Sequence, residues 1–147
     1  MTREDAAAPE YDFEIELEVR DYECDLQGVV NNAVYLNYLE HARHDCLHRY
    51  GFTFADLHRQ GCDLVVTRLE IDYRAALRPG DRFAVRTLLR RASRLRFAFD
   101  QEIRRRPDGQ LMVSALVIGT GVMNGRPGMP RDLREAMDAD PPAAGAV

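Results

Sequence analysis

The sequence predicts an α+β fold in which a five-stranded antiparallel sheet wraps around one long central helix. Three observations lead to this prediction. Apolar and charged residues alternate over residues 11–21, a helical pattern with a broad apolar face follows at 32–50, and four further strand-like stretches come after it. Short turns join those four stretches, which favours antiparallel pairing because parallel neighbours need a long crossover connection.

The first strand is predicted for residues 11–21, before the long helix. Its apolar positions are two residues apart, and glutamate or arginine lies between them. The apolar set is Phe13, Ile15, Leu17 and Val19. This period indicates a strand with one face toward the core and one toward solvent.

The long helix is predicted to begin at Asn31 or Asn32 as its N-cap and to stop at Gly51. At about 100° per residue, its apolar side chains gather on one broad face. That face consists of Val34, Tyr35, Tyr38, Leu39, Ala42, Cys46 and Tyr50. Such a wide apolar arc indicates a helix wrapped by a sheet. A second, short helix is expected at 53–60.

The remaining strands are predicted at residues 64–75, 82–91, 95–105 and 111–122. Turn sequences rich in Pro, Gly, Asp and Ser separate them at 78–81, 92–93 and 107–109. Alternation places Val65, Thr67 and Leu69 on one face of the first strand, and Phe83, Val85, Thr87 and Leu89 on one face of the second. On the exposed face, arginines are expected to pair with Asp100 and Glu102 across the strands.

Residues 1–10 read as a polar, disordered leader, and residues 11–130 as the single domain. The tail at 131–147 is expected to contain a short helix near 131–137.

Composition excludes several classes of protein. The net charge of −4 argues against a nucleic-acid partner, and no apolar run is long enough to span a membrane. All 20 basic residues are arginine, which excludes Schiff-base chemistry on lysine. Three cysteines without a C-x-x-C spacing argue against a disulfide framework or a zinc ribbon. We therefore expect a cytoplasmic protein.

The junction between the first strand and the long helix carries the candidate chemistry. Asp25 lies in a short loop, and Asn32 follows seven residues later at the helix start. The first N–H groups of a helix lack intrahelical partners and lie at the positive end of its dipole. A carboxylate beside such a helix start can act on a carbonyl group while the N–H groups bind the negative charge that develops on oxygen.

The same junction resembles a known family. The pattern D-x-x-G-V-V-x-N-x-x-Y is formed here by Asp25, Gly28, Val29, Val30, Asn32 and Tyr35. It resembles the hotdog-fold acyl thioesterases of the 4-hydroxybenzoyl-CoA thioesterase type. The stretch from residue 19 to 44 is especially similar to the single-hotdog acyl-carrier-protein thioesterases of plant plastids and their bacterial relatives, and LRPGD at 77–81 also matches.

The resemblance implies a hotdog fold and hydrolysis of an acyl-CoA or acyl-carrier-protein thioester, without a metal or organic cofactor. It implies that Asp25 is the catalytic carboxylate and that the backbone amide of Asn32 polarises the thioester carbonyl. Asp25 could attack the carbonyl carbon or deprotonate a water, and both roles remain open. The other substrate-binding candidates are Gly28, Val30, Tyr35, Thr67, Arg91, Ser93 and Arg94.

Assembly is the next expectation. A sheet of five strands leaves open edges, which dimerisation through an edge strand would cover. We therefore expect a homodimer with active sites at the subunit interface, or a homotetramer built from such dimers.

Several alternatives stand beside this interpretation. Cys24 could be a nucleophile, Glu40 on the helix could be the catalytic carboxylate, and His44 and His48 have an i, i+4 metal spacing. We favour small-residue packing for Cys24, a supporting or interface role for Glu40 and a solvated surface for the two histidines, because no histidine lies near Cys24 in sequence and no H-E-x-x-H arrangement is present. At the level of function, the alternatives are a non-catalytic acyl-thioester or fatty-acid binding protein and a dehydratase. A dehydratase needs a histidine that the 25–32 loop lacks.

Overall fold

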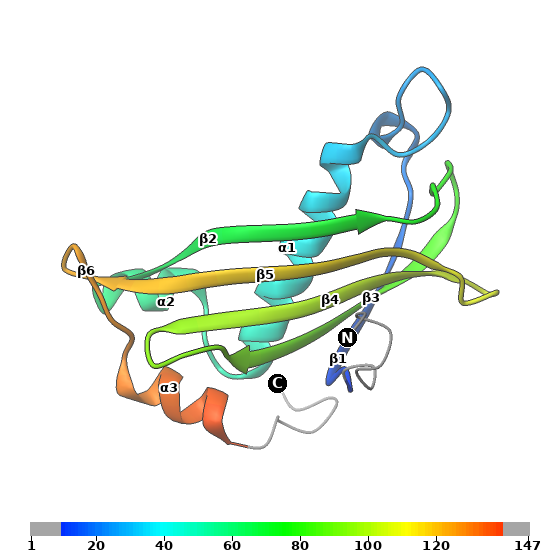
Figure 1. Cartoon of the computed structure of the whole chain (residues 1–147). Helices are drawn as coiled ribbons and strands as arrows, with labels where there is room; N and C mark the ends of the chain where they lie inside the picture. The colour runs from blue at the N-terminus through cyan, green and yellow to red at the C-terminus, as the bar shows by residue number, and fades with distance from the viewer. Residues whose placement is uncertain (1–9, 140–147) are drawn as a thin grey trace, which may run out of the picture.

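The computed structural model describes residues 10–139 and shows one curled antiparallel sheet with helices on its concave side (Figure 1). The strand order is β1-β3-β4-β5-β2, so the sheet has β1 and β2 at its edges. The strands are β1 Phe13–Glu18, β2 Cys62–Tyr73, β3 Arg82–Arg91, β4 Arg96–Arg106, β5 Leu111–Met123 and the short β6 Arg126–Pro127 beside β5. The predicted antiparallel sheet is confirmed.

The central helix α1, Asn32–Arg49, crosses the concave face of the sheet (Figure 1). Asn31 is its N-cap, and Gly51 lies just beyond its C-terminal end with φ of 90°. A positive φ is a conformation that glycine adopts without the steric penalty of a Cβ. The predicted boundaries of this helix are therefore confirmed.

The core lies between α1 and the inner faces of the central strands. Leu39 and Cys46 of α1 are fully buried, and Phe83, Ile103 and Val117 face them from β3, β4 and β5. The predicted alternation of β3 is also observed, because Phe83, Val85, Thr87 and Leu89 are all buried. Burial of this apolar surface is the main favourable term for the fold.

Leu39 provides a test of this core. We expect Leu39→Ala to lower the free energy of unfolding by about 2–5 kcal/mol, because the rigid surroundings close a cavity only partly. Urea denaturation measures the change. Leu26→Ala is the matched control, since Leu26 is fully exposed and its truncation should change stability by less than about 0.5 kcal/mol. Equal effects of the two variants would contradict the packing described.

Two short helices pack at the same end of the sheet (Figure 1). α2, Phe54–Arg59, follows its N-cap Thr53, and α3, Arg131–Asp138, packs Leu133 and Met137 into the core. Both were predicted. The predictions for residues 1–9 and 140–147 lie outside the described residues. Within the described part, no helix is long and apolar enough to cross a membrane, and the cytoplasmic location stays a prediction.

The face assignment within β2 differs from the prediction. The simple alternation placed Val65, Thr67 and Leu69 on one face, but the register against β5 shifts between Val66 and Arg68. This bulge adds one residue to β2 and reverses the alternation. Val66 and Leu69 therefore share the concave face, and Val65 lies on the other. The sequence does not indicate this shift, because the residues around it are apolar and include no turn residue.

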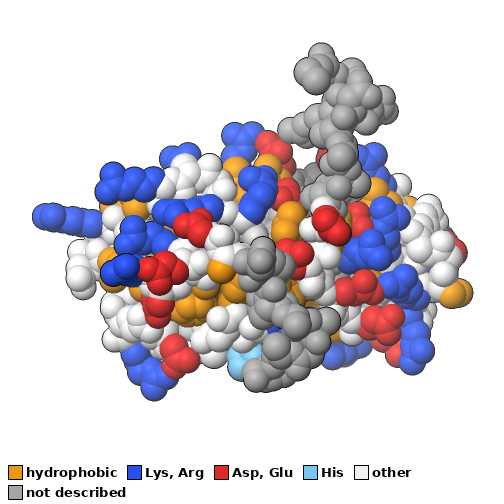
Figure 2. Space-filling view, turned by 90° about the horizontal axis from the view of Figure 1, so that it is seen from below, with side chains coloured by type: hydrophobic (Ala, Val, Ile, Leu, Met, Phe, Trp, Pro, Cys, Tyr) orange, Lys and Arg blue, Asp and Glu red, His pale blue; other side chains and the backbone are white. Residues whose placement is uncertain are grey.

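The convex face of β3 and β4 carries paired charges. Arg90 contacts Asp100, and Glu102 lies between Arg86 and Arg104. These are the cross-strand pairs expected from the alternating charges. Arginine and acidic side chains are also interspersed over the face shown in Figure 2. The partly exposed Arg90–Asp100 pair contributes only about 0–1 kcal/mol. Glu102 is buried, so its two arginine partners offset the hydration that its carboxylate loses.

Candidate active site

The loop that carries Asp25 is a small hairpin between β1 and α1. Cys24 and Val30 form an isolated antiparallel bridge, and the Asp25 N–H donates to the Val29 carbonyl at 2.9 Å. Gly28 closes the turn by donating its N–H to the Asp25 carbonyl at 3.0 Å, with φ of 74°. A residue with a Cβ would be strained at that φ, so Gly28 shapes the loop that presents Asp25.

The Asp25 carboxylate is oriented by its own loop. Its Oδ1 atom accepts the N–H of Gln27 at 2.8 Å and, more weakly, that of Val29 at 3.5 Å. No donor among residues 10–139 contacts its Oδ2 atom. One oxygen therefore fixes the side chain, and the other is free to act on a substrate or a water molecule.

The start of α1 offers one free N–H group. Asn31 uses its side-chain oxygen to accept the Ala33 N–H at 2.9 Å and its carbonyl to accept the Val34 N–H at 2.9 Å. The N–H of Asn32 has no acceptor in the described part of the chain. The cap thus leaves the Asn32 N–H as an available donor at the positive end of the helix dipole.

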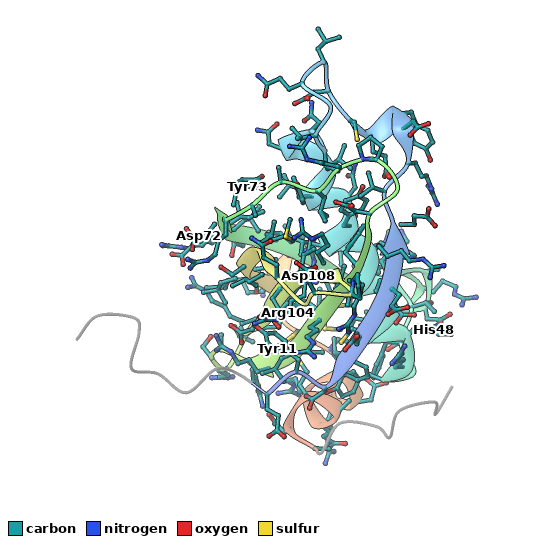
Figure 3. All side chains as sticks on the ribbon, turned by 90° about the vertical axis from the view of Figure 1, so that its right-hand side faces the viewer. Tyr11, His48, Asp72, Tyr73, Arg104 and Asp108 are labelled. Atoms are coloured by element: carbon teal, nitrogen blue, oxygen red, sulfur yellow. The ribbon has the colours of Figure 1, made fainter. Side chains whose placement is uncertain are left out.

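Two tyrosines hold this helix start in place. The Tyr73 hydroxyl donates to the Asn32 carbonyl at 2.8 Å, and the Leu77 N–H donates to the Tyr35 hydroxyl at 2.9 Å. The two rings meet edge to face, 5.5 Å apart. Tyr73 lies at the end of β2 nearest the Asp25 loop (Figure 3). Sequence reasoning assigned Tyr73 only to a strand, because its partner is 41 residues away.

These groups line one open cavity of about 400 Å³. It brings together the predicted residues Asp25, Val30, Asn32 and Tyr35, with Tyr73 and Arg74 at its wall. Val30 is buried and Asp25 is exposed. The cavity therefore combines a carboxylate, a free backbone donor and an apolar wall.

The other predicted binding residues lie elsewhere in the chain. Arg91, Ser93 and Arg94 belong to the β3–β4 hairpin, while the opposite end of β3, at Arg82, follows the 77–81 turn, whose Leu77 carbonyl accepts the Val30 N–H. Nine residues of strand separate the two ends of β3 by roughly 30 Å. Arg91 also pairs with Asp138 of α3. Within the chain, this hairpin therefore does not reach Asp25.

Thr67 lies in the β2 bulge and donates its hydroxyl to the Ile118 carbonyl. It is also separate from the cavity around Asp25.

Cys24 is poorly suited to be a nucleophile. Burial, and then the carboxylates of Asp21 and Glu23, raise the pKa of its thiol, so the thiol form prevails at neutral pH.

The helix histidines are exposed, as expected for a solvated face. Within residues 10–139, no group of three or more His, Cys, Asp or Glu side chains is placed to hold a metal ion.

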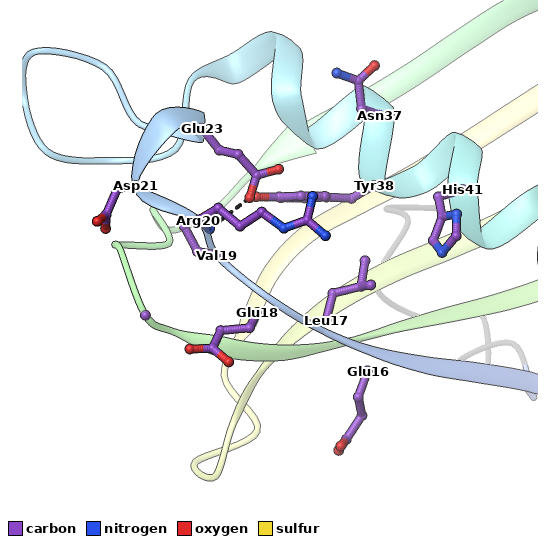
Figure 4. A pocket seen from close by; sticks show the side chains of 11 residues that line it. Glu16, Leu17, Glu18, Val19, Arg20, Asp21, Glu23, Asn37, Tyr38 and His41 are labelled. Atoms are coloured by element: carbon purple, nitrogen blue, oxygen red, sulfur yellow. Dashed lines mark hydrogen bonds between the residues drawn. The ribbon is translucent and has the colours of Figure 1, made fainter.

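A larger cavity of about 800 Å³ lies between β1 and α1 (Figure 4). Four carboxylates and one arginine line it together with Tyr38 and His41; the carboxylates are Glu16, Glu18, Asp21 and Glu23. Coenzyme A and phosphopantetheine carry phosphate, which this acidic surface would repel. The cavity around Asp25 is therefore the better candidate for thioester chemistry.

A helix enclosed by a curled antiparallel sheet, with a carboxylate loop at the helix start, defines the hotdog-fold class of proteins. The chain belongs to the Thioesterase-like superfamily, whose family model matches residues 19–137. That match begins just after β1 and covers the Asp25 loop, α1 and the strands from β2 onward.

Individual relatives agree with this assignment. A chloroplastic acyl-acyl carrier protein thioesterase of Arabidopsis thaliana is 43% identical over 102 residues, which are 69% of this chain and 54% of that protein. The Escherichia coli long-chain acyl-CoA thioesterase FadM is 30% identical over 105 residues, 71% of this chain and 79% of FadM. The chain spans about half the length of the plant relatives it matches.

Solved structures share the fold. A 1,4-dihydroxy-2-naphthoyl-CoA thioesterase from Synechocystis has a TM-score of 0.81 at 24% identity, covering 86% of this chain and 95% of its own. A DHNA-CoA thioesterase from Staphylococcus aureus has a TM-score of 0.78 at 27% identity, covering 85% and 87%. The predicted hotdog fold is thus confirmed.

Proposed function

We propose that the protein hydrolyses an acyl-CoA or acyl-carrier-protein thioester to the free acid and the thiol at the Asp25 cavity. One observation carries this proposal: the same cavity contains the Asp25 carboxylate, whose Oδ2 atom is free, and the Asn32 backbone N–H, which has no acceptor in the described part of the chain. The names of the relatives support thioesters as the substrate class.

The thioester carbonyl oxygen would bind at the Asn32 N–H. Negative charge grows on this oxygen as the carbonyl carbon becomes tetrahedral, and a preorganised donor with the helix dipole behind it stabilises that charge. The donor costs no reorganisation during the reaction, because Asn31 and Tyr73 already fix the first turn of α1.

Asp25 supplies the second half of the reaction by one of two routes. As a general base it removes a proton from water, the hydroxide adds to the carbonyl carbon, the C–S bond breaks, and the proton returns to the thiolate. As a nucleophile its Oδ2 bonds to the carbonyl carbon and expels the thiolate, and water then hydrolyses the mixed anhydride. Both routes yield one acid and one thiol from one thioester and one water.

The working assembly would be a homodimer formed through β2, or a tetramer of such dimers. β2 is a 12-residue edge strand, and it exposes Val65, Val66, Leu69 and Tyr73. A long apolar edge of this kind is a template for pairing with another strand. Pairing there would place a second subunit beside Tyr73, against the open side of the cavity, and would let the partner's β3–β4 hairpin approach the thiol carrier.

Thiol release from a panel of acyl-CoA and acyl-carrier-protein substrates tests the proposal. We expect multiple turnovers for at least one acyl group, measured with a thiol reagent. Binding of acyl thioesters without turnover would instead support the non-catalytic alternative. A water-eliminating reaction on hydroxyacyl thioesters, without thiol release, would support a dehydratase.

A further inference from the structure

Residues of α1 and β2 line both the Asp25 cavity and a second, smaller cavity, and we call the surface of α1 and β2 between these two cavities the groove. One flank of α1 presents a stripe of residues at spacings of three and four: Asn32, Leu36, Glu40, Arg43 and Leu47. The facing side of β2 presents Tyr73, Leu69 and Val66, whose exposed fractions are 47%, 39% and 48%. Tyr73 and Asn32 line the first cavity, so this uncovered surface begins at the proposed reaction centre.

The groove ends in a small cavity of about 90 Å³ that combines apolar walls with polar groups. Phe54, Val66 and Phe97 are among its apolar residues, and its polar side chains are Glu40, Arg43 and His44. An aliphatic acyl chain fits the walls. The polar groups need a different explanation, because a purely aliphatic chain leaves them without partners.

Arg43 is held in this cavity by a buried polar network. Its Nη1 donates to Oε1 of Gln101 at 3.1 Å. The Gln101 amide nitrogen donates to the Leu39 carbonyl at 3.0 Å and to the Thr87 hydroxyl at 3.1 Å. Gln101 and Thr87 are each only 1% exposed, so the core itself fixes the position of the guanidinium. Such a network is retained only if its members are satisfied.

Arg43 nevertheless keeps unused donors. Among the described residues, it has no carboxylate partner within ion-pair distance, and Gln101 occupies only one of its five N–H groups. A half-buried guanidinium without an anion is costly, because part of its hydration is lost. The remaining donors therefore favour an oxygen atom supplied by whatever occupies the cavity.

The neighbours of Arg43 indicate which oxygen group fits. Glu40 lies on the same cavity wall and contacts His44 at 3.6 Å, and burial lowers the pKa of His44, so this histidine is neutral at pH 7. A hydroxyl group can accept from Arg43 and donate to Glu40. A carboxylate can only accept, and Glu40 would repel it.

We propose, building on the thioesterase function proposed above, that Arg43 selects acyl groups that carry a hydroxyl near the far end of a medium-length chain. Arg43 is 11 residues beyond Asn32, about 16 Å along the helix axis, and its side chain leans back toward the helix start. A lean of about one helical turn leaves about 11 Å, and because an extended alkyl chain advances about 1.25 Å per C–C bond, roughly ten carbons cover this distance. A single aromatic ring on the carbonyl is too short.

The test compares ω-hydroxydecanoyl-CoA with decanoyl-CoA by the ratio of their kcat/KM values. We expect the wild-type protein to prefer the hydroxylated chain by about tenfold, the size of one hydrogen bond to a charged group. Arg43→Met keeps an unbranched, flexible apolar stem but removes the N–H donors, and it should bring the ratio close to one. Arg131→Met, on the exposed surface of α3, should keep the wild-type ratio.

Each outcome decides the proposal. Equal wild-type kcat/KM values for the two chains would overturn it, and so would an unchanged ratio in Arg43→Met or a preference for decanedioyl-CoA over the hydroxylated chain. The wild-type ratio needs no variant, so misfolding of Arg43→Met leaves the proposal testable. Hydrolysis of decanoyl-CoA with no preference would refute the role of Arg43 alone, whereas thiol release from no substrate would refute the thioesterase function.

Discussion

Asp25→Asn is expected to lower kcat by a factor of about 10²–10⁴, the usual contribution of a positioned acid–base group. Asparagine can still accept the Gln27 N–H, so the loop should keep its shape. It can neither remove a proton from water nor form a mixed anhydride. Turnover in a thiol-release assay and the melting temperature together separate lost chemistry from lost structure.

Two matched variants accompany this one. Cys24→Ser changes the neighbouring residue and should keep most of the activity, because the thiol is protonated at neutral pH. Glu40→Gln changes the nearest carboxylate on α1, at the far end of the groove, and should reduce turnover far less than Asp25→Asn. If Asp25→Asn turned over at the wild-type rate while Glu40→Gln did not, the catalytic carboxylate would belong to the helix.

Leu69→Arg is expected to have the second large effect, on assembly. Leu69 is 39% exposed on the edge strand β2, and a two-fold interface there would bury the new charge in both subunits. An unpaired buried charge costs several kcal/mol, and each 1.4 kcal/mol is a factor of ten, so the dimer dissociation constant should rise at least about 100-fold. Sedimentation velocity over a concentration series measures it.

Glu16→Arg is the control for this prediction. It places the same guanidinium on β1, the opposite edge of the sheet, where Glu16 is exposed. The control should assemble like the wild type. If Glu16→Arg dissociated the dimer and Leu69→Arg did not, the subunits would pair through β1. A monomeric wild-type protein at micromolar concentration would rule out the assembly proposed for the function.

The fold was predictable because local signals agreed with each other. The β3 boundaries at Arg82 and Arg91 follow from unbroken alternation between two turn sequences, and the α1 boundaries follow from Asn31 and Gly51. The face of Val65 was not predictable, because a bulge inside an apolar strand leaves no turn residue to mark it.

The site was predictable only as far as it is local in sequence. Asp25 and Asn32 are seven residues apart, and helix-start physics connects them. Tyr73 reaches Asn32 across 41 residues, and Gln101 reaches Arg43 across 58, so neither contact could be found from spacing. No motif or spacing in the sequence distinguishes Arg43 from the other polar residues of α1. Only the three-dimensional structure sets it against Gln101 and the end of the groove.

The most direct test of the central claim is a crystal structure with a non-hydrolysable acyl-CoA analogue that keeps the carbonyl group. We predict that the carbonyl oxygen lies about 2.7–3.1 Å from the Asn32 nitrogen, as in other oxyanion sites. Asp25 Oδ2 should lie beside the carbonyl carbon, within reach of direct attack or of one intervening water. A carbonyl oxygen bound away from the start of α1, with Glu40 as the nearest carboxylate, would contradict the mechanism.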